Sequence, residues 1–315
     1  FSDRSVINES SYGFMYTHGE AIYSRTVFPS QDTPIYKVTS TAKIKVKNPY
    51  VVLYSGILKS TEKSEDYLIY HYEMDKPIPT YLITFAVGMF EKHVISNKCE
   101  VWGEKASLKL VPQSFELCDQ YIDFYSNIKP FAFGKMVFLI MPNDFPYSGT
   151  ENPCVTYISE DMLSADKSYS NTIAHEIAHF WSGNLVTNKG WDCFWLNEGI
   201  TTYLTRKALK QFYGEEEYKF QITEGIRKLN HTIEEFKEKY PKQPSLRSLN
   251  QQVKDDPYIS FSKIPYEKGS LFMYHIEQVV GNSTMNKLLS EYFKAFEFKT
   301  IGNNEFVNFW KSKVK

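Results

Sequence analysis

The sequence predicts an α+β protein, with an N-terminal antiparallel β domain followed by a region that becomes mostly helical. Three observations predict this class. Residues 38–87 consist of short β-rich runs separated by Gly, Ser, Asp and Pro. No helical segment lies between these runs, which favours antiparallel pairing because parallel strands need a long crossover connection. After a Pro- and Gly-bearing stretch at 146–153, amphipathic helical segments that end at glycines dominate the chain.

The first β-rich run gives the clearest strand. Over residues 38–46, apolar and small side chains such as Ala42, Ile44 and Val46 alternate with Thr and Lys. This period of two is typical of a strand with one solvated face. Further strands are expected at 51–57, 67–72 and 81–87.

The character of the chain changes near Gly88. We therefore expect two domains in this chain, at 1–88 and 89–315. In the second domain, strands are expected at 100–102 and 136–141, with a helix at 113–125 between them. The later helices are expected at 170–182, 197–213, 215–239, 266–280, 283–296 and 303–313. Glycine commonly ends a helix, and it stands at the expected ends as Gly183, Gly214 and Gly281.

The charge balance excludes several classes of partner. The 315 residues carry 36 basic and 37 acidic side chains, a formal net charge of −1. A nucleic-acid or anionic-membrane surface needs a clustered excess of Lys and Arg, so we expect neither partner. No apolar run approaches the length of a membrane span. The four cysteines have no CxxC spacing, and we expect free thiols rather than a disulfide framework.

A metal-binding pattern lies in the expected helix at 170–182. His175 and His179 enclose Glu176 in the motif His-Glu-x-x-His. Two histidines four residues apart share one helix face, so both imidazoles can reach a single ion. Glu176 is rotated off that face, where it can take a proton from a metal-activated water molecule. The motif alone is a modest signal.

A third candidate ligand strengthens the prediction. Glu198 lies in the segment Trp-Leu-Asn-Glu-Gly at 195–199, with eighteen residues, 180–197, between it and His179. That gap accommodates a helix end, a loop and the start of a second antiparallel helix. Zinc accepts imidazole and carboxylate ligands and keeps one position for water in catalytic sites. We therefore predict one zinc ion on His175, His179 and Glu198.

The spacing of these ligands resembles that of the gluzincins, and the surrounding motifs are similar to those of zinc aminopeptidases of the leukotriene A(4) hydrolase type. The resemblance implies a thermolysin-like zinc metallopeptidase domain after a partial β domain, with the family's C-terminal helical domain outside this chain. It also implies a metallo-aminopeptidase with a peptide substrate, in the cytoplasm, and we expect a monomer. The matching motifs are EAI at 20–22, FPSQDTP at 28–34, FPYSGTENP at 145–153, NLVTNK at 184–189, WLNEG at 195–199 and IPYEKG at 264–269.

The resemblance also implies roles for single residues. Glu151, helped by Glu20, would bind the α-ammonium of a peptide, although Glu20 could instead be a solvated charge beside a strand. Tyr266 would donate a hydrogen bond to the oxyanion of the transition state. Asp192 either orients a ligand histidine or caps a turn, and the sequence leaves both open.

The sequence departs from the family pattern around Glu151, where Ser148, Gly149 and Thr150 occupy a substrate-binding stretch that usually begins with Gly and carries Met. The Cβ of Ser148 would hinder backbone approach, and Thr150 would make the first subsite more polar. The residue preferred at the peptide N-terminus therefore stays open.

Two departures bear on lipid chemistry. Tyr258 and Phe261 stand where the leukotriene enzyme has an Asp and a Tyr. We therefore favour peptide hydrolysis over the alternative of a bifunctional leukotriene A(4) epoxide hydrolase. A second alternative is a catalytically inactive binding or structural relative.

Overall fold

The computed structural model describes residues 13–253 and 256–314. They form two compact units, each built from separate stretches of the chain. The first unit contains residues 13–32, 38–120 and 133–176. The second contains 33–37, 121–132, 177–253 and 256–314. Sheets come first and helices later along the chain, which confirms the predicted α+β class. The predicted domain boundary after Gly88 stays a prediction.

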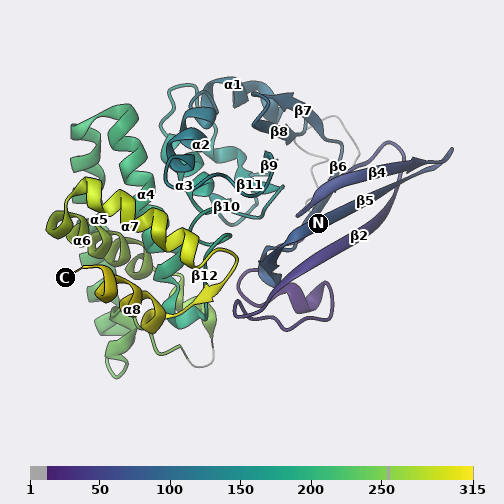
Figure 1. Cartoon of the computed structure of the whole chain (residues 1–315). Helices are drawn as coiled ribbons and strands as arrows, with labels where there is room; N and C mark the ends of the chain where they lie inside the picture. The colour runs from purple at the N-terminus through teal and green to yellow at the C-terminus, as the bar shows by residue number, and fades with distance from the viewer. Residues whose placement is uncertain (1–12, 254–255, 315) are drawn as a thin grey trace. The chain divides into compact units, whose positions relative to one another are not determined.

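The strands of the first unit form three sheets within the described residues, with the orders β2-β5-β4, β1-β6-β3 and β10-β11-β9-β8-β7 (Figure 1). As expected, β4 pairs antiparallel to β5, and β6 pairs antiparallel to both β1 and β3. The strands are β1 (Met15–Tyr16), β2 (Lys37–Lys47), β3 (Val51–Tyr54), β4 (Ile57–Lys63), β5 (Tyr67–Pro79), β6 (Phe85–Gly88), β7 (Glu91–Val94), β8 (Cys99–Gly103), β9 (Met136–Met141), β10 (Gly149–Thr150) and β11 (Thr156–Ser159).

The alternating pattern of β2 has the predicted effect. Its apolar side chains at Ala42, Ile44 and Val46 pack against a cluster that contains Tyr54 and Tyr70. The expected strand at 51–57 is instead two strands, because the chain turns between β3 and β4. Every residue of β4 is exposed, so it carries no apolar alternation that sequence analysis could detect.

The five-stranded sheet carries part of the candidate site. Its central strand β9 pairs parallel to both β8 and β11, and all but one of its residues are buried. Strands covered on both faces have continuous apolar sequences, which explains the run Met-Val-Phe-Leu-Ile-Met. Strand β10 lies at the edge and pairs antiparallel to β11, so that Gly149 is opposite Ile158 and Thr150 opposite Tyr157.

The helices agree with the expected bounds to within two residues except at three places. The expected helix at 113–125 is broken into α1 and α2, the one at 170–182 ends at Ala178, and the one at 266–280 begins as a π-helical turn, Ile264–Lys268. The helices are α1 (Val111–Ser114), α2 (Cys118–Ser126), α3 (Ser170–Ala178), α4 (Trp195–Tyr213), α5 (Glu215–Lys239), α6 (Gly269–Val280), α7 (Asn282–Ala295) and α8 (Asn303–Lys313). Two short strands, β12 (Thr187–Asn188) and β13 (Thr300–Ile301), pair in parallel.

Helix α4 is the central helix of the second unit, with contacts to α5, α6 and the π-helical turn. Two glycines allow its close approach to α6. A Cβ atom on Gly199 would lie 2.6 Å from the Cα of Gly269, far inside van der Waals contact. Gly183, Gly214 and Gly281 all have positive φ. Gly214 and Gly281 directly follow α4 and α6, as predicted, whereas Gly183 lies in the turn beyond α3, which already ends at Ala178.

Within the described part of the chain, no helix combines the length and apolar character that a membrane crossing requires. All four cysteines are buried free thiols, which agrees with the prediction from their spacing.

Candidate metal centre

The His-Glu-x-x-His segment forms the end of helix α3 and the turn after it. His175 lies in the last turn of the helix and His179 lies just beyond Ala178. The boundary between the two units falls after Glu176, inside this continuous helix, so the two histidines share one stretch of backbone. The main chain then folds back, with the amide of Asn184 donating to the carbonyl of His179 at 2.9 Å.

Glu198 lies in the first turn of α4, where the positive end of the helix dipole favours a carboxylate. Its amide donates to the carbonyl of Phe194 at 3.1 Å, and the residue is only 4% exposed. The expected second helix therefore delivers this carboxylate, as the spacing predicted.

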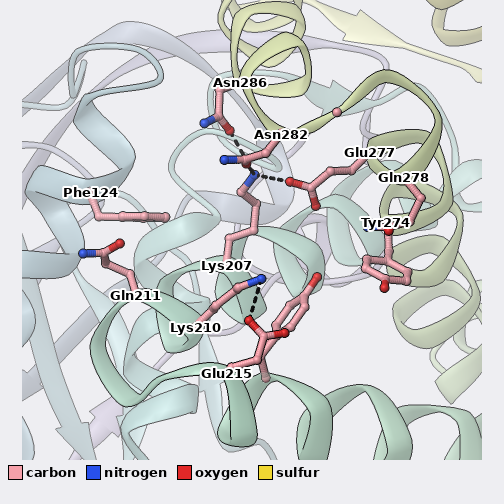
Figure 2. A pocket seen from close by; sticks show the side chains of 12 residues that line it. Phe124, Lys207, Lys210, Gln211, Glu215, Tyr274, Glu277, Gln278, Asn282 and Asn286 are labelled. Carbon is pink, nitrogen blue, oxygen red and sulfur yellow. Dashed lines mark hydrogen bonds and ion pairs between the residues drawn. The ribbon is translucent and has the colours of Figure 1, made fainter.

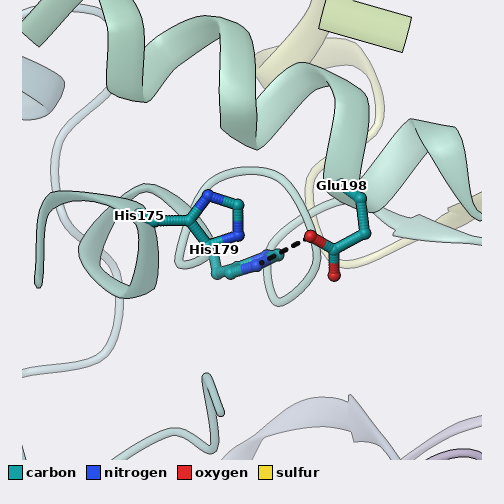
Figure 3. A group of neighbouring side chains, drawn as sticks. All are labelled: His175, His179 and Glu198. Carbon is teal, nitrogen blue, oxygen red and sulfur yellow. Dashed lines mark ion pairs between the residues drawn. The ribbon is translucent and has the colours of Figure 1, made fainter. Parts of the chain in front are cut away.

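The structure brings the three candidate ligands together (Figure 3). One ligand atom each of His175, His179 and Glu198 lies within 4.8 Å of the others. Nε2 of His179 and Oε2 of Glu198 are 3.4 Å apart. Zinc bonds in tetrahedral geometry place neighbouring ligand atoms roughly 3.3–3.6 Å apart. The donor set and this distance therefore fit one zinc ion.

The orientation of His179 is set by two groups that the sequence analysis missed. Its Nδ1 lies 3.0 Å from the carbonyl oxygen of Ser182 and 3.2 Å from the hydroxyl of Thr201. An N–H at Nδ1 donates to the carbonyl and leaves the Nε2 lone pair facing Glu198. The Thr201 hydroxyl donates to the same carbonyl at 2.9 Å. These contacts, rather than Asp192, hold the ring from its Nδ1 side.

Ser182 also connects the two ligand-bearing segments. Its hydroxyl donates to the carbonyl of Leu196 at 2.7 Å, two residues before Glu198. The amide of Asn188 donates to the side-chain oxygen of Asn197 at 2.9 Å. The loop after α3 is thus hydrogen-bonded to the start of α4 at several points.

Glu176 lies against the edge strand of the five-stranded sheet. A Cβ atom on Gly149 would lie 2.6 Å from the Cδ atom of the Glu176 carboxyl, so only glycine permits this approach. Glu176 is 5% exposed, and one of its carboxyl oxygens lies within 4.8 Å of one of Glu151. The missing Cβ of Gly149 therefore leaves room for the Glu176 carboxyl group. The expected effect of the Ser148 Cβ on backbone approach stays a prediction.

Thr150 is buried beside these carboxylates, and its hydroxyl accepts a hydrogen bond from the side-chain amide of Asn152 at 2.9 Å. The main chain of Ser148 is fixed by its carbonyl, which accepts from the amide of Ser159 at 3.0 Å. The departure at Thr150 therefore places a hydroxyl that is already hydrogen-bonded where the family has a thioether.

Glu20 is buried in the same unit, at 8% exposure, and not a solvated charge. Burial, followed by the nearby Glu20 carboxylate, raises the pKa of Tyr147. Tyr147 directly precedes Ser148, so Glu20 lies close to the stretch that contains Glu151. Burial lowers the pKa of His18, two residues earlier in the sequence, to about 4.

Tyr266 lies in the π-helical turn that precedes α6. Such turns are frequent at functional sites. The next residue, Glu267, forms a buried ion pair with Arg206 of α4, and Arg206 also donates to the hydroxyl of Ser270 at 3.0 Å. The Arg206 guanidinium therefore links α4 to the π-helical turn through Glu267 and to the first turn of α6 through Ser270.

An aromatic cluster occupies the positions that bear on lipid chemistry. Phe261 packs on Phe194 with ring centroids 4.6 Å apart and on Tyr258 at 5.3 Å. Phe194 also contacts Tyr266 edge-on at 6.1 Å. Aromatic rings of Phe194, Tyr258 and Trp191 therefore contact Phe261.

A separate cavity of about 680 Å³ lies among helices α4, α5, α6 and α7 (Figure 2). Its ammonium groups are bound by other residues of the lining. Lys207 donates to Glu277 and Asn282 at 2.7 Å and to Asn286 at 2.9 Å, and Lys210 pairs with Glu215. These mutual contacts indicate a structural polar cluster that fastens the four helices together.

The fold and the ligand cluster thus have the features of a metallopeptidase domain. Comparison with known families agrees: the peptidase family M1 domain matches residues 107–315, and the peptidase M1 N-terminal domain matches residues 5–82. The chain belongs to peptidase family M1. Its cofactor is one zinc ion, for which the His/His/Glu cluster has the required donors.

The chain is similar to named relatives over nearly its whole length. It is 33% identical to leukotriene A-4 hydrolase of Xenopus laevis, covering 96% of this chain and 50% of the relative. It is 34% identical to leucine aminopeptidase 2 of Aspergillus niger, covering 95% and 48%. The structure of native yeast LTA4 hydrolase superposes with a TM-score of 0.87 at 34% identity, covering 95% and 47%. The chain spans about half the length of these relatives.

Proposed function

We propose that this protein is a zinc-dependent aminopeptidase that removes N-terminal residues from short peptides. The observation that carries the proposal is the cluster of His175, His179 and Glu198. In this cluster, Nε2 of His179 lies 3.4 Å from Oε2 of Glu198. Similarity to leucine aminopeptidase 2 supports the substrate class. Zinc on these ligands supplies Lewis-acid polarisation of the scissile carbonyl and lowers the pKa of the attacking water.

Glu176 is the proposed general base. Its carboxylate accepts a proton from the attacking water and then passes it to the leaving nitrogen, which departs as a neutral amine. The position of this carboxyl group beside Gly149 supports the role, because a Cβ atom there would occupy the space that the carboxyl group uses. Tyr266 is the proposed oxyanion donor, through a phenol hydrogen bond that strengthens as charge develops.

Glu151 and Glu20 are the proposed binding groups for the free α-ammonium of the substrate. The buried carboxylates of Glu151 and Glu176 lie within 4.8 Å of each other, and this concentration of negative charge favours a cation. An ammonium bound there fixes the first peptide bond relative to the base, so that one residue is removed per encounter. Ser148, Gly149 and Thr150 would line the adjoining substrate position.

The central test compares zinc content and turnover of a fluorogenic aminoacyl substrate in the complete protein. Glu176→Gln should retain one equivalent of zinc and lose about 10²- to 10⁴-fold in kcat. Glu224→Gln, a partly exposed position on α5, is the matched control and should keep full activity. Wild-type protein that binds zinc but leaves this substrate intact would contradict the proposal.

Ammonium recognition is tested with the same substrate carrying an acetylated N-terminus. We expect no turnover of the blocked substrate, and a raised KM for the free one in Glu151→Gln, because the amide no longer offers a full charge. Equal turnover of free and blocked substrates would indicate an endopeptidase instead.

Peptide hydrolysis is favoured over leukotriene A(4) epoxide hydrolysis by the aromatic cluster around Phe261. Tyr258 offers a phenol where the leukotriene enzyme has a carboxylate that directs water. We expect no turnover of the epoxide by a preparation that cleaves peptides. The alternative of an inactive relative is disfavoured by the complete ligand cluster, and absence of bound zinc would revive it.

We further propose that the protein acts in the cytoplasm. The four buried free thiols support a reducing compartment, where disulfides are rare. The expected monomeric state stays a prediction.

A further inference from the structure

A lysine outside the candidate ligand set holds the loop that follows helix α3. Nζ of Lys37 donates to the carbonyl of Asn184 at 2.9 Å and to that of Leu185 at 3.0 Å. Both acceptors belong to the turn that begins directly after the ligand segment. Residues 33–37 are part of the second unit, together with this loop.

The partners of Lys37 are unusual for a lysine. Among the residues that the structure describes, no carboxylate forms an ion pair with it, and its hydrogen bonds go to the main chain of one loop. Burial lowers the pKa of its ammonium to about 7. The neutral amine still has two N–H groups for the two carbonyls, so the contact persists in either protonation state.

The same loop contains the group that orients His179. The carbonyl of Ser182, two residues before Asn184, lies 3.0 Å from Nδ1 of the imidazole. The amide of Asn184 donates back to the carbonyl of His179 at 2.9 Å. Lys37 therefore binds two carbonyls of the same loop whose Ser182 carbonyl orients the imidazole of His179.

We propose that Lys37 is a positioning residue for the zinc ligand His179, acting through the loop 182–185. This inference rests on the proposed function, because it assumes that His179 binds zinc. A partner that orients a ligand histidine commonly changes metal affinity by 10- to 100-fold. Lys37 acts one contact further away, and we expect the lower end of that range.

The test measures zinc affinity of the complete protein by competition with a chromophoric chelator, together with the visible spectrum of the Co²⁺-substituted protein. Lys37→Met keeps the aliphatic stem and removes the donors, and it should raise the zinc Kd about tenfold and alter the Co²⁺ bands. Lys37→Arg restores donors and should return both readouts toward wild type. Lys299→Met is the matched control, because Lys299 also donates to a carbonyl, that of Ala295, at an exposed site.

The outcomes separate this inference from the proposed function. A folded Lys37→Met protein with wild-type zinc Kd and Co²⁺ spectrum would overturn the positioning role and leave the proposed function intact. Wild-type protein without zinc affinity would overturn both. Should Lys37→Met not fold, Lys37→Gln and Lys37→Arg are compared instead. The shorter glutamine should weaken zinc binding more than arginine does, and equal Kd values would contradict the inference.

Discussion

Two segments that pack on helix α4 are held in place by different physical means. The loop at 182–188 is held by hydrogen bonds of hydroxyl, amide and lysine groups to main-chain carbonyls and to Asn197. The π-helical turn Ile264–Lys268 is held by the buried ion pair of Glu267 with Arg206 and by glycine contacts.

The difference concerns how each segment responds to the loss of one group. A typical hydrogen bond contributes about 1 kcal/mol, so the loop is stabilised in small increments. Removing one half of a buried ion pair leaves an uncompensated charge, which costs far more than the pair contributes. Stability at the turn is therefore concentrated in one contact, whereas at the loop it is distributed.

The largest effect is expected at the ion pair. Arg206→Met should lower the free energy of unfolding by about 3–5 kcal/mol, because the carboxylate of Glu267 stays buried without its partner. The measurement is urea unfolding followed by circular dichroism. Arg206→Met combined with Glu267→Met should recover much of the loss. The exposed pair Arg227–Glu224 is the control, and Arg227→Met should cost at most about 1 kcal/mol. Equal losses at the two pairs would refute the comparison.

An intermediate effect is expected where α4 meets α6. Gly199→Ala would place a Cβ atom 2.6 Å from the Cα of Gly269, and the helices would have to separate. Overpacking of this kind costs about 1–3 kcal/mol. Because Gly199 follows Glu198, the zinc Kd should rise as well. Thr223→Ala on the exposed face of α5 is the control, and unchanged unfolding of Gly199→Ala would show that the contact is not tight.

The smallest effect is expected within the loop. Ser182→Ala removes one hydroxyl donor to the carbonyl of Leu196 and leaves the Ser182 carbonyl in place. We expect a loss of about 0.5–1.5 kcal/mol in unfolding free energy, with His179 still oriented. Thermal unfolding without zinc measures the loss of stability, and the added stability in the presence of zinc shows whether His179 still binds the ion. A loss as large as that of Arg206→Met would mean that the loop is not held by distributed contacts.

Sequence analysis predicted the parts of the structure that depend on local chain geometry. The bounds of α5 and α8 follow from helical periodicity and end signals, and the pairing of His175 with His179 follows from one helical turn. It failed where no local signal exists. Strand β4 has no buried face, and the π-helical turn before α6 contains the same residue types as an ordinary helix.

For the candidate site, the sequence named the chemical groups but not what holds them. Ser182 and Thr201 act on His179 through a carbonyl and a hydroxyl, and no motif marks such a carbonyl. Lys37 lies 147 residues from the Asn184 carbonyl that it binds, so only the folded chain reveals the contact. The reason for a glycine at position 149 comes from the tertiary structure, in which a Cβ atom there would collide with the Glu176 carboxyl group.

By itself, the sequence determined the fold class, the metal-binding residue types and their spacing, because helical periodicity and ligand chemistry act over a few residues. Only the tertiary structure decided how the ligands are oriented and which contacts are tight. Those properties depend on main-chain carbonyls, which every residue carries, and on the absence of a Cβ atom at Gly149 and Gly199. Neither feature is marked by the chemistry of a side chain. They arise from close packing of distant segments, which no local pattern encodes.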